Sequence, residues 1–220
     1  MNEKRQDDYV PALGHDWLTP LYDVFIRWTI RESFIKGELI DQAKIEAGHR
    51  VLDLGCGTAT LTLLVKRTHP GAGVVGLDGD PRILQIARSK ALREGLEVTF
   101  DLGMAFELPY PDRSFDRVLS SLMIHHLTAE NKHHAAREVF RVLRPGGEFH
   151  VVDFGKPRSA AMRAIAFFVS RGHGAERMVD NLNGRLPGFF TAAGFLDAKE
   201  TRQFTTVYGT LSFYQAKKPD

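Results

Sequence analysis

The sequence predicts an α/β fold in which a mostly parallel sheet is flanked by helices. Short apolar runs alternate with segments of helical spacing, which is the pattern of repeated βα units. The first apolar run, 51–54, ends in a glycine-rich turn. The second, 73–77, is followed by Asp80 and Pro81, which suit the cap and the first position of a helix. These turns join a strand to a helix, as a parallel sheet requires.

The remaining elements follow from the same patterns. Strands are expected over 51–54, 73–77, 98–102, 115–121 and 148–154, with two closing strands, an antiparallel pair, over 198–204 and 210–216. Helices are expected over 60–68, 81–94, 129–143, 160–170 and 186–193. Pro145 stops the third of these helices, and Gly194 suits the end of the last.

The length of 220 residues predicts one domain. Residues 1–46 are interpreted as an N-terminal helical lid within that domain, because 17–30 has helical spacing, and residues 47–220 as its main body. The single cysteine, Cys56, excludes an intramolecular disulfide and a cysteine-rich zinc site. The helix expected over 160–170 contains Arg163 and is much shorter than a membrane span.

Charge and the N-terminal sequence indicate which partners and which location the protein is expected to have. A net charge of +2 without a dense Lys and Arg run disfavours nucleic-acid binding. The first ten residues, MNEKRQDDYV, are too polar for a secretory signal. We therefore expect a soluble, cytoplasmic protein without a transmembrane segment. Peripheral membrane contact stays compatible with the sequence, and the oligomeric state is not readable from it.

The glycine-rich turn indicates a ligand site at the end of the first strand. It reads Val-Leu-Asp-Leu-Gly-Cys-Gly-Thr-Ala-Thr over 51–60. A dinucleotide site requires a third small residue where this chain has Thr60, and Asp53 would repel phosphates. The ammonium of a zwitterionic ligand could instead be met by Asp53. The alternative is a plain βα turn without a ligand.

An acid at the end of the second strand points to a ribose. Asp78 lies 21 positions after Gly57. A carboxylate at the carboxyl edge of a parallel sheet can accept hydrogen bonds from ribose hydroxyls. Two further segments belong to the pattern, Leu-Pro-Tyr-Pro-Asp-Arg-Ser-Phe-Asp over 108–116 and Val-Phe-Arg-Val-Leu-Arg-Pro-Gly-Gly over 139–147.

In order and spacing, these four segments closely resemble class I S-adenosylmethionine-dependent methyltransferases, above all the ubiquinone and menaquinone biosynthesis C-methyltransferases. The resemblance covers about 48–155 and continues through 186–195. It implies a Rossmann-like, seven-stranded sheet of order 3-2-1-4-5-7-6, with 47–220 as the methyltransferase domain. It also implies S-adenosylmethionine as the methyl donor and a small organic acceptor.

The same resemblance implies which residues contact the cofactor. The methionine moiety would be surrounded by Asp53, Gly55, Gly57 and Thr58, with Asp53 serving its ammonium directly or through water. Asp78 would bind the ribose, Gly79 would let the backbone approach the nucleoside, and Ser120 and Ser121 would lie under the cofactor. Tyr22 would close over the methyl donor, or else its helix would pack on the sheet edge.

One position departs from the family. The segment Gly103-Met104-Ala105 stands where the family usually has Gly-Asp-Ala, whose aspartate accepts from the adenine amino group. Met104 cannot accept that bond well, although a thioether packs favourably on a purine face. The backbone at Ala105 can still donate to the ring.

Two histidines after the fourth strand are the candidates for a catalytic base. His126 and His125 face the expected acceptor side, and an imidazole titrates near neutral pH. The alternative is that they cap the loop or pack beside the cofactor. No metal is expected, because neither these histidines nor His133 and His134 have the i, i+4 spacing of a zinc helix.

The segment 160–170 is the part of the sequence that bears on the methyl acceptor. Apolar side chains of 160–170 suit an aromatic, quinone-like or lipid-like acceptor, or else they bury against the domain. A nucleic-acid methyltransferase and a non-catalytic S-adenosylmethionine-binding protein are the alternative functions. The acceptor atom, whether C, N, O or S, is not readable from the sequence.

Overall fold

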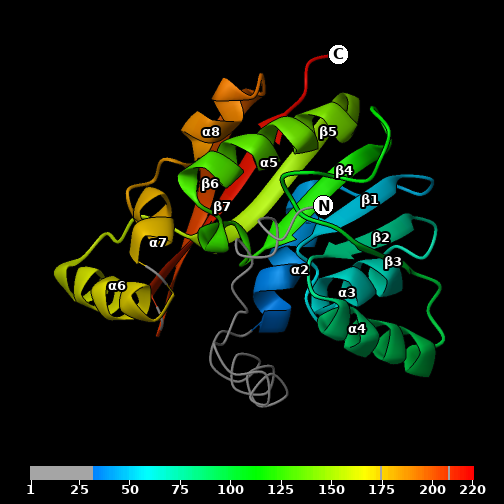
Figure 1. Ribbon diagram of the computed structural model, residues 1–220, viewed down its shortest axis with the longest axis horizontal. Coiled ribbons are helices and arrows are strands. Elements are labelled where there is room, and N and C mark those ends of the chain that lie inside the picture. Colours follow the sequence, from blue (N-terminus) through cyan, green and yellow to red (C-terminus); the bar gives the residue numbers. More distant parts are fainter. Residues whose placement is uncertain (1–31, 174, 208) are drawn as a thin grey trace, which may run out of the picture.

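A seven-stranded sheet in the order β3-β2-β1-β4-β5-β7-β6 forms the centre of the computed structural model, which describes residues 32–173, 175–207 and 209–220 (Figure 1). β1 to β5 run parallel, and β7 is antiparallel to both β5 and β6. The strands are β1 (Arg50–Leu54), β2 (Gly73–Asp78), β3 (Thr99–Leu102), β4 (Phe115–Ser121), β5 (Leu143–Phe154), β6 (Leu196–Thr206) and β7 (Gly209–Lys217). The predicted strand order and the antiparallel closing pair are confirmed.

Helices cover both faces of this sheet. They are α2 (Glu32–Ala43), α3 (Thr60–Thr68), α4 (Pro81–Glu94), the 3-10 turn η3 (Ile124–His126), α5 (Ala129–Val142), α6 (Ala160–His173), α7 (Ala175–Leu182) and α8 (Leu186–Ala192). None of the helices in the described ranges is long and apolar enough to cross a membrane. α4 begins as predicted, with the Asp80 carboxylate accepting from the backbone N–H of Arg82 at 2.8 Å and with Pro81 in the first turn.

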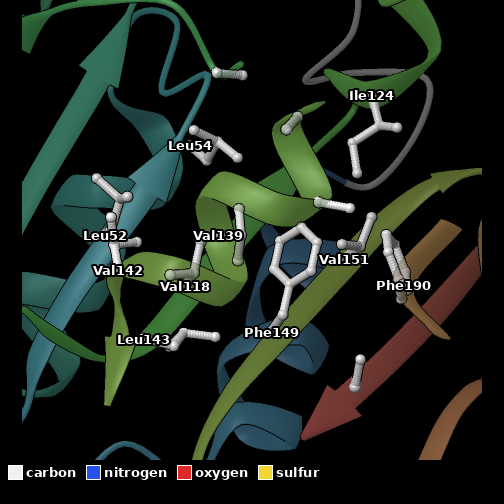
Figure 2. Packing of buried hydrophobic residues seen from close by; sticks show 14 of the residues in the cluster. Leu52, Leu54, Val118, Ile124, Val139, Val142, Leu143, Phe149, Val151 and Phe190 are labelled. Carbon is white, nitrogen blue, oxygen red and sulfur yellow. The ribbon is translucent and has the colours of Figure 1, made fainter. Parts of the chain in front are cut away.

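The alternation of side chains along the strands assigns each helix to a face. Phe149 and Val151 of β5 pack in one cluster with α5 and α8, as the labelled side chains of Figure 2 show. Val152, one residue further, belongs to a second cluster with α2 and α3. Successive side chains of a strand point to opposite faces, so an uninterrupted apolar run serves both layers.

Several boundaries differ from the sequence prediction. β5 begins at Leu143 instead of 148, because its first residue pairs with Phe115 before a register shift in the β4–β5 ladder. α5 accordingly ends at Val142. β6 and β7 extend beyond their predicted ends, and α7 was not predicted. α7 has only eight residues, fewer than the roughly 11–18 over which a helical period is read, and two of its three buried side chains, Asp180 and Asn181, are polar.

Part of the segment interpreted as a lid is described, and it packs on the sheet. α2 contacts β4 and β5 through buried residues that include Ile35, Leu39 and Ile40. Near its end, the Gln42 side-chain amide donates to the carbonyl of Tyr214 in β7 at 3.0 Å. Residues 17–30, and Tyr22 among them, lie outside the described residues.

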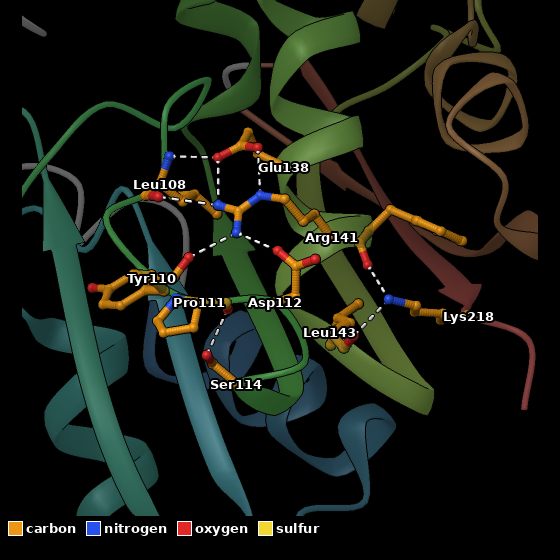
Figure 3. Close-up of polar contacts among 10 residues, drawn as sticks. Leu108, Tyr110, Pro111, Asp112, Ser114, Glu138, Arg141, Leu143 and Lys218 are labelled. Atoms are coloured by element: carbon orange, nitrogen blue, oxygen red, sulfur yellow. Dashed lines mark hydrogen bonds and ion pairs between the residues drawn. The ribbon is translucent and has the colours of Figure 1, made fainter.

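One arginine explains two of the sequence segments that resembled the family. The Arg141 guanidinium donates to the carbonyls of Leu108 and Tyr110 and to the carboxylates of Asp112 and Glu138, at 2.7–3.1 Å (Figure 3). Glu138 in turn accepts from the backbone N–H of Leu108 at 2.7 Å, and the guanidinium lowers the pKa of that carboxyl. The 108–112 loop is thereby held on α5.

Candidate cofactor site and acceptor side

The candidate site lies at the carboxyl edge of the parallel strands. β1 pairs with β2 on one side and with β4 on the other, so the chain order reverses between β1 and β4. Ligands of open α/β sheets bind at such a switch point, outside the carboxyl ends of the strands. The residues that follow β1, β2, β4 and β5 therefore gather at one edge, although they are distant in sequence.

The glycine-rich turn after β1 is held in a shape that glycine favours. Gly55 has a φ of +72°, and a Cβ added there would lie 2.2 Å from Cγ of Met123. The backbone N–H groups of Gly55 and Cys56 both donate to the carbonyl of Leu77, at 2.8 and 2.9 Å. Gly57 also has a positive φ, of +54°. The turn is thus packed against the end of β2 and the loop after β4.

Asp78 joins the ends of β1 and β2. Its carboxylate accepts from the backbone N–H of Gly57 at 2.9 Å and from that of Asp80 at 3.0 Å. Burial raises the pKa of Asp78, and the backbone hydrogen bonds oppose this shift. A carboxylate has about four lone-pair positions, so two bonds leave it able to accept ribose hydroxyls. Gly103 donates to the carbonyl of Asp78 at 3.1 Å, which brings the segment containing Met104 to the same place.

Asp53 lies beneath the turn. Its side chain is buried and accepts from the hydroxyl of Thr62 in α3 at 2.6 Å. Burial raises the pKa of Asp53 to about 6, against the opposing effect of the Thr62 hydrogen bond. A buried carboxylate is costly without a compensating positive charge. The ammonium of an amino-acid ligand carries the positive charge that would stabilise this carboxylate.

The serines at the end of β4 have different surroundings. Ser120 donates to the carbonyl of Leu54 at 3.1 Å, which ties β4 to the end of β1. The Ser121 hydroxyl is buried and has no hydrogen-bond partner within the described part of the chain. A buried hydroxyl usually has a partner, so its position at this edge fits a bound ligand. The Thr58 hydroxyl accepts from Lys90 of α4 at 2.8 Å.

A buried histidine–aspartate pair lies at the ends of β4 and β5. Nδ1 of His125 is 2.7 Å from Oδ1 of Asp153, and the two side chains are 3% and 0% exposed. The Asp153 carboxylate also accepts from the backbone N–H groups of His125 and Phe154, at 3.2 and 2.7 Å. Because an ionised carboxylate only accepts, it places the imidazole proton on Nδ1 and the lone pair on Nε2.

The other histidines of this region are arranged differently. The His126 ring is partly exposed and lies 4.0 Å from the His125 ring, between centroids. His133 and His134 are exposed on α5. Across 32–173, 175–207 and 209–220, no three His, Cys, Asp or Glu side chains are grouped to hold a metal ion.

Helix α7 covers η3 and β5, on the side of the site where the methyl acceptor is expected and which we call the acceptor side. The sequence did not predict this helix. It contacts both η3 and β5. Lys132 of α5 anchors it, because the buried ammonium donates to the carbonyl of Arg177 and lies 3.5 Å from the Asp180 carboxylate. Asn181 is fully buried, and its amide atoms have no hydrogen-bond partner among the described residues. The available signal was the amphipathic order of apolar and polar residues over Ala175–Leu182, which the sequence prediction did not use.

This arrangement defines the class of protein. The fold is shared with phosphoethanolamine N-methyltransferase 2 of Haemonchus contortus, solved in complex with S-adenosylmethionine, at a TM-score of 0.68 and 18% identity. That comparison covers 84% of this chain and 52% of the other. The sheet order is that of the Rossmann-like methyltransferase fold.

The sequence comparisons identify the family. Residues 51–147 match the model of a methyltransferase domain. The demethylmenaquinone methyltransferase of Thermus thermophilus is 35% identical over 190 residues, which cover 81% of this chain and 79% of that one. The ubiquinone/menaquinone biosynthesis C-methyltransferase UbiE of Pasteurella multocida is 36% identical over 60% of this chain and 49% of its own length. The chain belongs to the family of S-adenosylmethionine-dependent methyltransferases that includes these enzymes.

Proposed function

We propose that this methyltransferase methylates a small, quinone-like aromatic acceptor whose proton is removed by His125. The observation that carries the proposal is the buried pair in which the Asp153 carboxylate lies 2.7 Å from Nδ1 of His125. The names of the relatives, which are quinone-biosynthesis methyltransferases, support an acceptor of this chemistry. An aromatic hydroxyl becomes a much better nucleophile, and activates its ring carbons, once it loses a proton.

The residues at the carboxyl edge fit the methyl donor. Asp78 would accept from the ribose hydroxyls, with Gly79 beside it, and Asp53 would face the ammonium. The remaining proposed contacts are Gly55, Gly57, Thr58, Met104, Ala105, Ser120 and Ser121, with Tyr22 from outside the described residues. When bound, S-adenosylmethionine supplies an electrophilic methyl group, so the protein mainly has to align the acceptor and remove its proton.

The His125–Asp153 pair suits the removal of the acceptor's proton. Asp153 keeps the proton on Nδ1, so Nε2 of His125 is the nitrogen that accepts a proton from the acceptor. Asp153 then stabilises the imidazolium that forms, and α7 shields the pair from water. General-base catalysis of this kind contributes about 10²- to 10⁴-fold in rate. His126, which stacks beside His125, is the second candidate base and would act from a more exposed position.

A panel of acceptors with radiolabelled methyl donor tests the proposed function. The panel holds hydroquinones, simple phenols, amines, thiols and oligonucleotides. Transfer to hydroquinones well above the other acceptors is expected. Transfer mainly to oligonucleotides would assign a nucleic-acid methyltransferase. Tight binding of S-adenosylhomocysteine without transfer to any acceptor would assign a non-catalytic binding protein. A cytoplasmic location stays a prediction from sequence composition.

The affinity for S-adenosylhomocysteine is expected to fall about tenfold between pH 7 and pH 5. The pKa of Asp53 in the free protein is about 6, so this carboxyl is mostly protonated at pH 5 and cannot meet the ammonium. As the pH rises through 6, the carboxyl ionises and affinity is gained. Calorimetric titrations across this range check the result. Asp53→Asn should bind weakly and flatten the profile; an unchanged slope in this variant would assign the effect to another group.

Met104→Asp is expected to tighten cofactor binding by up to about 1 kcal/mol, the net value of one hydrogen bond to the adenine amino group. The loss of thioether packing and the desolvation of a carboxylate oppose this gain. Met104→Ala separates the two effects, because it removes the packing and adds no acceptor. If Met104→Ala leaves the affinity unchanged and Met104→Asp weakens it, the adenine does not lie beside this residue.

A further inference from the structure

Helix α6 presents an aromatic stripe to solvent. Phe167 and Phe168 are 56% and 72% exposed, and their rings pack edge to face with centroids 5.7 Å apart. Arg163 and Arg171 are exposed one helical turn before and after Phe167, so they extend the same stripe. The Arg171 guanidinium lies over the Phe167 ring, 5.0 Å from its centroid.

The opposite side of α6 attaches it to the domain. Ala166 and Ser170 are buried, and Ile165 and Val169 are partly buried. α6 contacts β7 and α7, and in Figure 1 it projects from the body of the molecule beside the ends of β6 and β7. The two phenylalanines are therefore not its core face. Large apolar side chains that project together from a helix attached by its other side mark an interaction surface.

The charge of this surface indicates its partner. Residues 155–174 contain Lys156, Arg158, Arg163 and Arg171 but neither Asp nor Glu, whereas the whole chain has 29 basic and 27 acidic residues. The Arg158 side chain is 77% exposed, although it pairs with Glu200 at 3.6 Å. Positive charge is thus concentrated in the segment that carries the two exposed aromatic rings, in an otherwise balanced protein.

We propose that α6 docks this methyltransferase on an anionic lipid bilayer. Aromatic side chains on an interfacial helix insert at the boundary between head groups and acyl chains, while basic side chains pair with lipid phosphates. α6 contacts α7, and α7 contacts η3, which carries His125. Docking would therefore bring the acceptor side to the membrane, where a lipophilic acceptor dissolves. The docking proposal itself depends on α6 and does not require the acceptor chemistry proposed above.

Sedimentation of the full chain with lipid vesicles tests the proposal. Vesicles of phosphatidylcholine with an equal part of phosphatidylglycerol are compared with vesicles of phosphatidylcholine alone. Binding at least tenfold stronger to the anionic vesicles, and weaker at high salt, is expected. The double variants Phe167→Ser/Phe168→Ser and Arg163→Glu/Arg171→Glu should each lose at least tenfold. The control is Leu92→Ser/Arg93→Glu, which replaces one exposed apolar side chain and one exposed arginine on α4 and should bind as the parent does.

Circular dichroism and S-adenosylhomocysteine binding establish that each variant is folded, and the charge variant tests the surface even if the aromatic variant is unstable. Absence of binding to anionic vesicles, or equal loss in the α4 control, would overturn the proposal. So would a dimer in sedimentation velocity without lipid that the aromatic variant converts to monomer, because the stripe would then be a contact between copies. Preference for a duplex oligonucleotide over the anionic vesicles would also overturn it.

Discussion

Replacing His125 by alanine is expected to lower kcat by about 10²- to 10⁴-fold, the usual contribution of a general base. The affinity for S-adenosylhomocysteine should change by less than about twofold, because His125 is assigned to the acceptor and not to the methyl donor. The imidazole is buried and oriented by Asp153 at 2.7 Å, so no neighbouring side chain can take its position without rearrangement. Single-turnover rates with a hydroquinone acceptor, together with calorimetry, provide the measurement.

Two further variants sharpen this test. Asp153→Asn preserves the shape, and its amide oxygen can replace Oδ1, which accepts from both Nδ1 of His125 and the N–H of Phe154. The substitution removes the negative charge that stabilises the imidazolium, so a loss of kcat is expected. His134→Ala, on the exposed face of α5, serves as the control and should leave the rate unchanged. A His125→Ala variant with normal kcat and a slow His126→Ala variant would transfer the role to His126.

Asp78→Ala is expected to cost about 1.5–3 kcal/mol of cofactor affinity, which is about 10- to 150-fold in Kd. The substitution removes a charged acceptor from the ribose and also the bonds that Asp78 makes to the N–H groups of Gly57 and Asp80. Both losses act on the cofactor edge, so kcat at saturating cofactor should change much less than affinity. Isothermal titration with S-adenosylhomocysteine measures the effect.

The neighbouring acid provides the control for this prediction. Asp80→Ala removes the cap of α4, so it should lower the free energy of unfolding by the value of an N-cap, about 1 kcal/mol, with little change in affinity. If Asp78→Ala binds within twofold of the parent while its fold is intact, Asp78 does not contact the ribose. If both variants weaken binding equally, the effect comes from the β2–α4 turn and not from one carboxylate.

The sequence by itself predicted the fold and which residues gather at the carboxyl edge of the sheet. Local patterns were sufficient, because a buried parallel strand is a short apolar run and each βα turn has its own residue types. Asp78 and Gly57 were assigned to one site from their places after successive strands, and their hydrogen bond at 2.9 Å brings them together. The Arg141 contacts show why the 108–116 and 139–147 segments occurred as a pair.

Only the tertiary structure decided how the acceptor side is arranged. His125 was noticed in the sequence, but its hydrogen bond to Asp153 depends on β4 and β5 lying side by side in a register that no local pattern encodes. α7 was missed because its eight residues are fewer than the roughly 11–18 over which a helical period is read. The apolar residues of α6 divided between burial and exposure, with Val169 partly buried and Phe168 exposed, because the orientation of a helix is set by the surfaces it packs against.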